Sequence, residues 1–326
     1  MVEGNGVDEP LLIRGNSRAP ARTVPRRFLE AIAGDDPLAC SSETSGRREL
    51  AEQVASAANP LTARVFVNRV WHHLFGRGIV ASVDNFGVLG ERPSHPELLD
   101  FLADRFVREG WSTKRLVRMI VLSSTYRMSS RADALSDEKG PDNVLLHRAR
   151  VRRLQGEALR DAMLLVSGRL DRTQFGPSVP VHLTPFMQGR GKPDKSGPLD
   201  GAGRRSLYLE VRRNFLSPFL LAFDTPIPFN TMGRRNVSNV PAQALILLND
   251  PFVTDEAKRW ARHTLEGPER TVQARVNAMY RAAFGREATP EEVAALGDFV
   301  QGRDDPDVWS AVAHVLFNSK EFLYIP

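Results

Sequence analysis

The chain has 326 residues, of which 42% are hydrophobic and 25% are charged, a composition typical of a globular protein and not of a disordered one. No apolar run approaches the roughly 18 residues of a membrane span. Residues 1–10 show no signal-peptide pattern, and the single cysteine, Cys40, excludes an intrachain disulfide bond and an all-cysteine metal site. The net charge is +5, but the arginines are spread along the chain, often beside acidic residues. This spread indicates a salt-bridged surface and argues against nucleic-acid binding.

The N-terminal 45 residues are rich in Pro, Gly and Ser and contain one short helical pattern, over residues 26–32. We expect residues 1–45 to form an extended arm. The first strong helix signals follow it. Residues 46–57 are amphipathic, and Asn59 followed by a proline predicts a capped helix that begins at residue 60. Glycines at 76 and 78 predict its end near Phe75.

Further helix signals continue along the chain. Ser94 and Glu97 have the spacing of a capping box, in which each side chain accepts from the other's backbone amide. Additional helices are predicted over residues 112–124 and 154–170. The same cap-then-proline pattern recurs at three later positions: Asp250-Pro251, Thr289-Pro290 and Asp305-Pro306.

Only the segment 206–211 alternates like a strand. The sequence therefore predicts a mainly α, multi-helix globular fold with at most a small β element near 206–211. Residues 46–264 would form a main helical domain. Residues 265–326 would form a C-terminal helical repeat unit packed on it.

One long loop interrupts the helical pattern. Between residues 176 and 203, 11 of 28 residues are Gly or Pro. The segment 189–193 lacks the P-loop spacing, and no predicted strand precedes it. Long loops inside a compact domain are uncommon and are often functional. We therefore consider two alternatives, a mobile surface loop and a lid or binding loop.

An internal repeat is also predicted. Residues 67–77 (VNRVWHHLFGR) align without gaps with residues 276–286 (VNAMYRAAFGR), and five positions are identical. Each segment is followed by a Pro-Glu helix start and then by a tryptophan, Trp111 or Trp309, before another apolar helix. We expect two structural copies of a three-helix unit, since stacking such units would bury their apolar faces.

No catalytic or cofactor motif can be read from the sequence. His72 and His73 are adjacent on a predicted helix, so their side chains diverge and cannot chelate one metal. No Cys-x-x-Cys-His run occurs, and we expect neither a metal nor a cofactor in this chain. The candidate site residues are polar side chains that could perform acid–base or anion-binding chemistry: Arg69, His73, Glu91, His95, Arg153 and Glu157.

Several segments of the chain resemble one protein family, and they lie at residues 59–78, 86–91, 94–100, 110–111, 123–127, 152–162 and 241–249. They are similar to the C-terminal domain of unknown function in planctomycete-type proteins that carry a cytochrome-c-like domain upstream. The resemblance implies export to the periplasm or cell surface, a c-type cytochrome domain as partner, and a role in breaking down complex polysaccharides. It carries no catalytic residues, and this chain shows neither a haem motif nor an export signal, which leaves the localisation open.

Three functions remain as hypotheses. The first is an accessory or interaction module that binds a partner domain or an anionic polysaccharide. The second is an enzyme of unrecognised type that acts on such a polysaccharide, with its site among the six candidates. The third, nucleic-acid binding, rests on basicity alone. Convergence of the candidate residues in one pocket would favour the enzyme.

Overall fold

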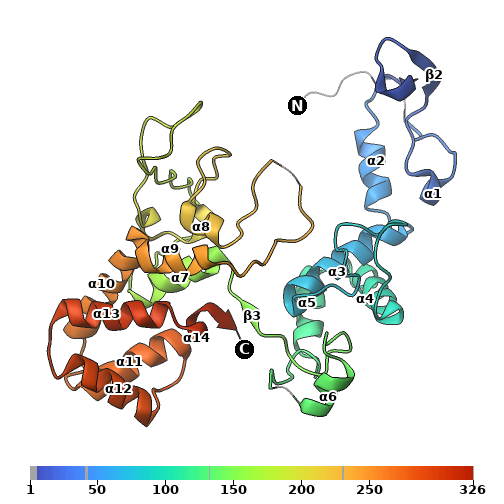
Figure 1. Ribbon diagram of the computed structural model, residues 1–326. Helices are drawn as coiled ribbons and strands as arrows, with labels where there is room; N and C mark the ends of the chain where they lie inside the picture. The colour runs from blue at the N-terminus through green and yellow to red at the C-terminus, as the bar shows by residue number, and fades with distance from the viewer. Residues whose placement is uncertain (1–5, 41–42, 132, 230, 326) are drawn as a thin grey trace. The chain divides into compact units, whose positions relative to one another are not determined.

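The computed structural model describes residues 6–40, 43–131, 133–229 and 231–325 (Figure 1). Within these ranges the chain forms 14 α-helices and two two-stranded sheets, which confirms the mainly α fold. The chain divides into two compact units, unit 1 over residues 1–149 and unit 2 over residues 150–326. Among the described residues, no helix combines the length and the apolar character that crossing a membrane requires.

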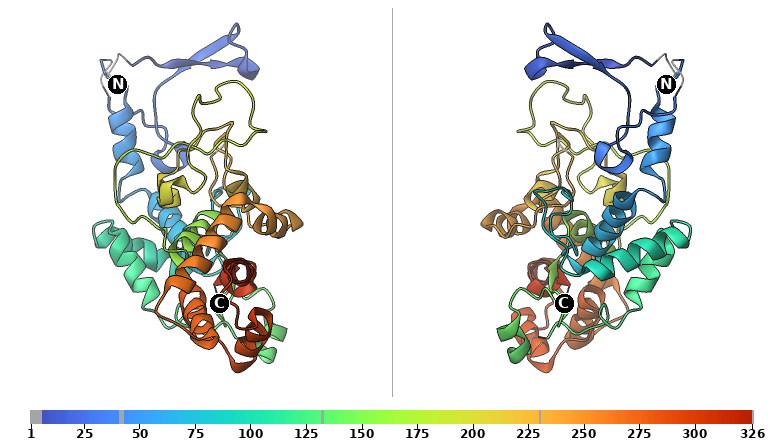
Figure 2. Two further views of the ribbon diagram at one scale, coloured as in Figure 1. Left: turned by 90° about the vertical axis from the view of Figure 1, so that its left-hand side faces the viewer. Right: turned by 90° about the vertical axis from the view of Figure 1, so that its right-hand side faces the viewer.

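Unit 1 begins with an antiparallel hairpin and continues with helices. The hairpin pairs β1 with β2, so the N-terminal segment expected as an extended arm contains ordered β structure (blue in Figure 2). The elements of unit 1 are β1 (Glu9–Leu12), the 3-10 turn η1 (Ile13–Gly15), β2 (Pro20–Val24), α1 (Glu30–Ala33), α2 (Arg47–Val54), α3 (Pro60–Phe75), α4 (Pro96–Arg108), α5 (Thr113–Val121) and α6 (Ala134–Lys139).

Unit 2 is built around α10 and α13, which pack side by side (Figures 1 and 2). Its short sheet pairs β3 with β4 near the C-terminus. The elements of unit 2 are β3 (Arg152–Arg153), α7 (Gly156–Val166), the 3-10 turns η2 (Gly201–Gly203) and η3 (Ser206–Tyr208), α8 (Pro218–Ala222), α9 (Pro241–Asn249), α10 (Pro251–Glu266), α11 (Val272–Phe284), α12 (Pro290–Val300), α13 (Pro306–Phe317), α14 (Lys320–Leu323) and β4 (Tyr324–Ile325).

The two units have separate apolar cores. In unit 1, α3, α4 and α5 cover one another's apolar faces around Val67 and Leu116. In unit 2, α7, α10, α11 and α13 share a core that contains Trp260, Trp309 and Phe317. The division at residue 149 differs from the one expected from the sequence, which grouped residues 46–264 together. It falls there because α3–α5 satisfy their apolar faces locally, whereas α7 and α10 bury theirs against the C-terminal helices.

The expected strand over residues 206–211 is wrong. Ser206–Tyr208 forms η3, and Leu209 makes only an isolated bridge to Val179. The alternating apolar side chains do not form a buried face, because Leu207 and Val211 are exposed. Ser206 is instead buried. Its backbone amide and its hydroxyl each donate a hydrogen bond to Asp161 Oδ1 at 2.7 Å.

Most predicted helix caps are present. Asn59, Asp250 and Asp305 each accept a backbone amide of the helix that follows, with a proline at its first position. The capping box predicted at Ser94 is not formed. His95 is the N-cap residue of α4, and the Ser94 hydroxyl donates to the Ile79 carbonyl oxygen at 3.2 Å instead.

Several contacts recur in the two predicted repeat copies. Both α3 and α11 end at a left-handed glycine, Gly76 or Gly285. About two turns before each end, an asparagine side chain holds the chain that follows the helix: Asn68 pairs with the Val80 backbone, and Asn277 accepts from the Ala288 amide. An aromatic pair also ends each helix, Trp71 with Phe75 and Tyr280 with Phe284. These contacts support the repeat.

The third helices of the two copies differ. Trp111 lies before α5, whereas Trp309 lies inside α13, so the two tryptophans are not equivalent. The equivalent positions are instead Ser123 and Ser319, each of which caps the following turn. α5 packs on both α3 and α4, while α13 packs chiefly on α10. The repeat therefore matches most closely over its first two helices and its final turn.

Candidate functional site

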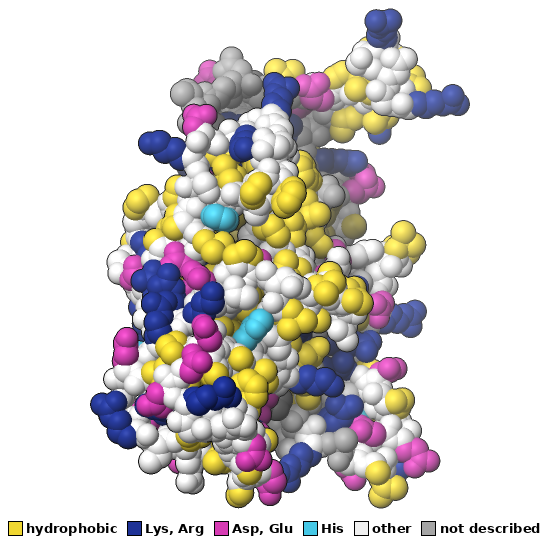
Figure 3. All heavy atoms as spheres, turned by 60° about the vertical axis from the view of Figure 1, so that its left-hand side comes forward, with side chains coloured by type: hydrophobic (Ala, Val, Ile, Leu, Met, Phe, Trp, Pro, Cys, Tyr) yellow, Lys and Arg dark blue, Asp and Glu magenta, His cyan; other side chains and the backbone are white. Residues whose placement is uncertain are grey.

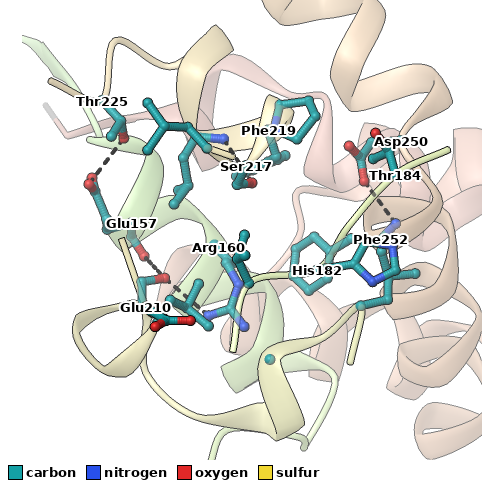
Figure 4. Close-up of a pocket in the computed structure, with 18 of the residues that line it drawn as sticks. Glu157, Arg160, His182, Thr184, Glu210, Ser217, Phe219, Thr225, Asp250 and Phe252 are labelled. Atoms are coloured by element: carbon teal, nitrogen blue, oxygen red, sulfur yellow. Dashed lines mark hydrogen bonds between the residues drawn. The ribbon is translucent and has the colours of Figure 1, made fainter. Parts of the chain in front are cut away.

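Unit 2 contains a cavity with a volume of about 170 Å³. Its walls come from α7, from the loops around residues 180–184 and 198–211, and from the N-terminal ends of α8 and α10 (Figure 4). Most of the wall is apolar. The polar and charged side chains that line it are Glu157, Arg160, His182, Thr184, Ser206, Glu210, Ser217, Thr225 and Asp250. Apolar walls with a few convergent polar groups are the usual arrangement of a small-molecule site.

Arg160 on α7 is buried, and its guanidinium fixes the loop that forms one wall. It donates to the backbone oxygens of Asp200 at 2.6 Å and Arg204 at 3.0 Å, and to Ser206 Oγ at 3.0 Å. Gly201 lies against it at a φ of +58°, where a Cβ atom would come within 2.5 Å of Arg160 Nη2. Because both Nη atoms donate to the protein, Arg160 shapes the wall and does not serve as a free anion site.

Glu157, one turn before Arg160, is held in its ionised form. Arg235 Nη1 donates to one carboxylate oxygen at 2.5 Å, and the Thr225 hydroxyl donates to the other at 3.1 Å. Burial is the largest single influence on the pKa of Glu157 and raises it, but the hydrogen bond and charge of Arg235, the Glu157 backbone amide and the Thr225 hydroxyl together lower the pKa below its ordinary value. Glu157 therefore presents a negative charge at the cavity wall at neutral pH.

The pKa of Asp250 is shifted in the opposite direction, upward. Its Oδ1 accepts from the Phe252 amide at 2.8 Å, as the cap of α10. Burial raises the pKa of Asp250 above its ordinary value, against the opposing effects of that amide and of the nearby His182. The His182 Nδ1 lies 3.0 Å from the Gly197 carbonyl oxygen, which only accepts, so Nδ1 carries the proton. In the neutral ring Nε2 is then the acceptor.

The two carboxyl groups lie on opposite sides of the cavity. In Figure 4, Glu157, Thr225 and Glu210 line one side, and Asp250 lies on the other with His182. Arg160 lies between them. Opposed shifts in the pKa values of two carboxyl groups are typical of sites in which one acts as an acid and the other stays ionised.

The Gly- and Pro-rich loop 176–203 contributes to this site. Residues near both of its ends, among them Val181 and Leu199, form part of the cavity wall. The Ser196 hydroxyl accepts from the Leu183 amide at 2.9 Å, which ties the two arms of the loop together. This arrangement favours the binding-loop alternative over the mobile surface loop.

Two of the six candidate residues lie in unit 2. Glu157 lines the cavity. Arg153 lies beside the site, where its Nη2 donates to Asp224 at 2.7 Å and its guanidinium stacks over the Phe223 ring at 5.1 Å. Asp224 also accepts from the amide and hydroxyl of Ser238. Arg153 therefore supports the chain next to the cavity and does not enter it.

The other four candidates lie in unit 1 and do not share one site there. Arg69 and His73 are exposed on α3. Glu91 borders a second cavity, of about 270 Å³, beside α4. The His95 Nδ1 is 2.9 Å from Ser94 Oγ at the start of α4. The predicted set is thus divided between the two units, so the convergence that would favour an enzyme is not found for these six residues.

Sequence reasoning missed three residues of the cavity. Asp250 was interpreted only as a helix cap, and Arg160 and His182 were not among the six candidate residues. The spacing of Glu157 and Arg160 on one helix face was visible, but their partners lie 40 or more residues away in sequence. No local pattern could therefore have joined them.

Within the ranges that the structure describes, no group of three or more His, Cys, Asp or Glu side chains is placed to hold a metal ion.

A family model described as PSD1, protein of unknown function (DUF1553), matches residues 46–300. The chain therefore belongs to this family, whose function is not established. No curated protein and no solved structure matches the chain.

Proposed function

We propose that this protein is an enzyme that cleaves a glycosidic bond of a polysaccharide by general acid catalysis in the cavity of unit 2. The observation that carries the proposal is the pair of carboxyl groups, Asp250 and Glu157, with opposed pKa shifts on opposite sides of one cavity. Glycosidases use such a pair. One carboxyl group gives a proton to the leaving oxygen as the glycosidic C–O bond breaks, and the other stabilises the sugar cation. A water molecule then adds to the cation and returns a proton to the first group.

The roles follow from the surroundings of each group. Asp250 is the proton donor, because burial favours its protonated form. Glu157 stays ionised through Arg235 and stabilises the positive charge that develops on the sugar ring. Arg160 is a positioning residue, because it holds the loop at Asp200 that forms the wall between them.

The cavity favours an uncharged sugar unit over an anionic one. Its walls are mostly apolar, with the rings of Phe219 and Phe252 among them. Arg235 and Arg212 are paired with the lining carboxylates Glu157 and Glu210, and the donors of Arg160 already serve the protein, so these three arginines are not free to bind an anionic substituent. The polysaccharide itself is proposed from the family resemblance. The preference for an anionic chain that the excess of arginine indicates does not extend to this cavity.

The test uses the substitution Asp250→Asn on the full chain. Asn caps a helix as well as Asp does, so folding is preserved while the proton donor is lost. We expect the release of reducing ends from a panel of neutral polysaccharides to fall by about 10²- to 10⁴-fold, the usual contribution of a general acid.

Asp305→Asn is the matched control. Asp305 caps α13 with the same geometry, accepting from the second amide of its helix at 2.9 Å, and it does not line the cavity. The Asp305→Asn variant should cleave the polysaccharide at the rate of the wild type. Equal rates for wild type and Asp250→Asn would refute the catalytic role of Asp250.

The pH profile gives a second readout. Activity requires Asp250 protonated and Glu157 ionised, so it should fall as the pH drops through the lowered pKa of Glu157. It should also fall as the pH rises through the raised pKa of Asp250. Loss of the alkaline limb in Asp250→Asn would assign that limb to Asp250.

An accessory or interaction module is the second candidate, and α9 is the observation that favours it. This helix contains no charged residue, yet Leu245 and Leu248 are 58% and 51% exposed. An exposed apolar helix face is typical of a docking surface for a partner protein such as a c-type cytochrome domain. For a module, Asp250→Asn and Asp305→Asn would be equally without effect.

A further inference from the structure

The two repeat copies place an arginine at the same backbone position. α3 ends at Gly76 with a φ of +78°, and α11 ends at Gly285 with a φ of +70°. The left-handed glycine turns the chain in the same direction in both copies. The next residue is Arg77 in the first copy and Arg286 in the second.

In the second copy the arginine is fully neutralised. Arg286 donates to both carboxylate oxygens of Glu292 at 2.8 Å and to both of Glu321 at 2.7 Å. Its guanidinium also lies over the rings of Tyr280 and Phe284. Two bidentate carboxylates satisfy a guanidinium geometrically, so the role of Arg286 is structural.

In the first copy both carboxylates are missing. Glu292 is the third residue of α12, and the third residue of α4 is Leu98. Glu321 lies two residues after the capping Ser319, and the residue two after the equivalent Ser123 is Thr125. The arginine has been kept at this position, and the two groups that would neutralise it have not.

Arg77 is consequently a half-buried cation without a counter-charge. Across the described residues its side chain makes no hydrogen bond or ion pair, and the same holds for the side chain of Arg127. The ring of Phe75 contacts the ring of Tyr126 at 5.6 Å, edge to face. This contact joins the two chain segments that carry the arginines, since Arg77 follows Phe75 by two residues and Arg127 follows Tyr126 by one.

We propose that Arg77 and Arg127 bind an oxyanion, a sulfate ester or a carboxylate carried by an acidic polysaccharide. A guanidinium matches the planar or tetrahedral oxygen pairs of these groups in a bidentate geometry. The anion would supply the negative charge that Glu292 and Glu321 supply to Arg286 in the second copy. This site lies in unit 1, and it does not depend on the cavity or on the proposed catalysis.

The test measures binding of the full chain to three polymers at low ionic strength, by the retardation of the protein in gels that contain each polymer. Dextran sulfate presents sulfate esters, polygalacturonate presents carboxylates, and unmodified dextran presents neither. We expect binding to one or both acidic polymers, weakened by added salt, and no binding to dextran. The comparison of the two acidic polymers identifies the anion.

The variants Arg77→Gln and Arg286→Gln separate binding from folding. Both remove one positive charge, so nonspecific attraction to a polyanion falls equally in the two. Arg77→Gln should weaken binding by about tenfold and leave the melting temperature unchanged. Arg286→Gln should lower the melting temperature and leave the binding near that of wild type.

A third variant, Thr125→Glu, restores one of the missing carboxylates. It should suppress binding of the acidic polymer without loss of melting temperature, because the new carboxylate would pair with Arg77 as Glu321 pairs with Arg286. The proposal is overturned if neither acidic polymer binds, if Arg77→Gln and Arg286→Gln weaken binding equally, or if Arg77→Gln destabilises the fold as much as Arg286→Gln does.

Discussion

Glu256 is a fully buried acid in the middle of α10, away from the cavity wall. The Ser167 hydroxyl donates to one carboxylate oxygen. The other oxygen has no hydrogen-bond partner among the described residues, and the Arg259 Nε lies 3.6 Å from the carboxylate. Burial raises the pKa of Glu256, because the ionised form loses its hydration. The folded state therefore favours the protonated acid.

This environment predicts a pH-dependent effect of Glu256→Gln. A raised pKa in the folded state means that the stability contributed by the protonated acid is complete below its ordinary value and is lost as the pH rises through the folded pKa. Gln cannot ionise. At about pH 8 the variant should therefore be more stable than wild type by about 1 kcal/mol, or about 2–4 °C in melting temperature.

The measurement is thermal unfolding of both proteins between about pH 4 and pH 8. The difference should shrink toward about pH 4, where both side chains are neutral. A difference that is the same at every pH would contradict the assignment, since it would come from packing.

At the scale of the elements, α3 and α11 each carry an asparagine that bonds to the backbone of the loop following the helix, and the two loops differ in length. The Asn68 side chain is fully buried and satisfies both the amide and the carbonyl of Val80. Gly78 makes room for it, because a Cβ there would lie 2.9 Å from its amide atoms. Asn277 is half-buried and accepts a single bond at 3.2 Å from the Ala288 amide. The first copy thus relies on this asparagine to anchor its longer connection between α3 and α4.

The asymmetry predicts different costs for one substitution. Asn68→Ala leaves two buried backbone groups of Val80 without partners, each worth about 1–3 kcal/mol. Asn277→Ala removes one weaker, partly exposed bond and should cost about 1 kcal/mol or less. Urea unfolding of the two variants tests this difference. Equal losses would show that the two asparagines do the same work, contrary to their surroundings.

At the scale of the whole molecule, one face can be inspected for the distribution of charge (Figure 3). On the face in Figure 3, Lys and Arg side chains lie among Asp and Glu side chains and form no continuous basic stripe. Ion pairs such as Arg64 with Asp100 and Arg169 with Asp200 bring acids and arginines together. On this face the charges of the arginines are therefore accompanied by nearby acids.

The separate cores predict that unit 2 folds alone. A fragment of residues 150–326 keeps the contacts of α7, α10 and α13, and the buried Trp260 and Trp309. It should show helical circular dichroism, tryptophan emission at the short wavelengths of an apolar environment, and one cooperative thermal transition. A fragment with tryptophan emission at the wavelength of unfolded protein would show that its core needs residues 1–149.

Much of the helical architecture could be predicted because its signals are local. Asn59, Asp250 and Asp305 cap their helices through atoms two residues away, and Gly76 ends α3 through its own backbone conformation. Such contacts depend on few neighbours. Ser94 is the instructive exception. Its hydroxyl had a second acceptor, the Ile79 carbonyl oxygen, which only the folded chain brings within reach.

The family pattern and the mainly α class follow from the order of residues, because caps, glycines and apolar spacing act within a few positions. Three features do not follow from it: the division at residue 149, the cavity, and the different surroundings of Arg77 and Arg286. Glu157 meets Arg235 across 78 positions, and Arg286 meets Glu321 across 35. The pKa of a carboxyl group depends on burial and on such distant partners, so its protonation, and with it the proposed chemistry, is set only when the chain is folded.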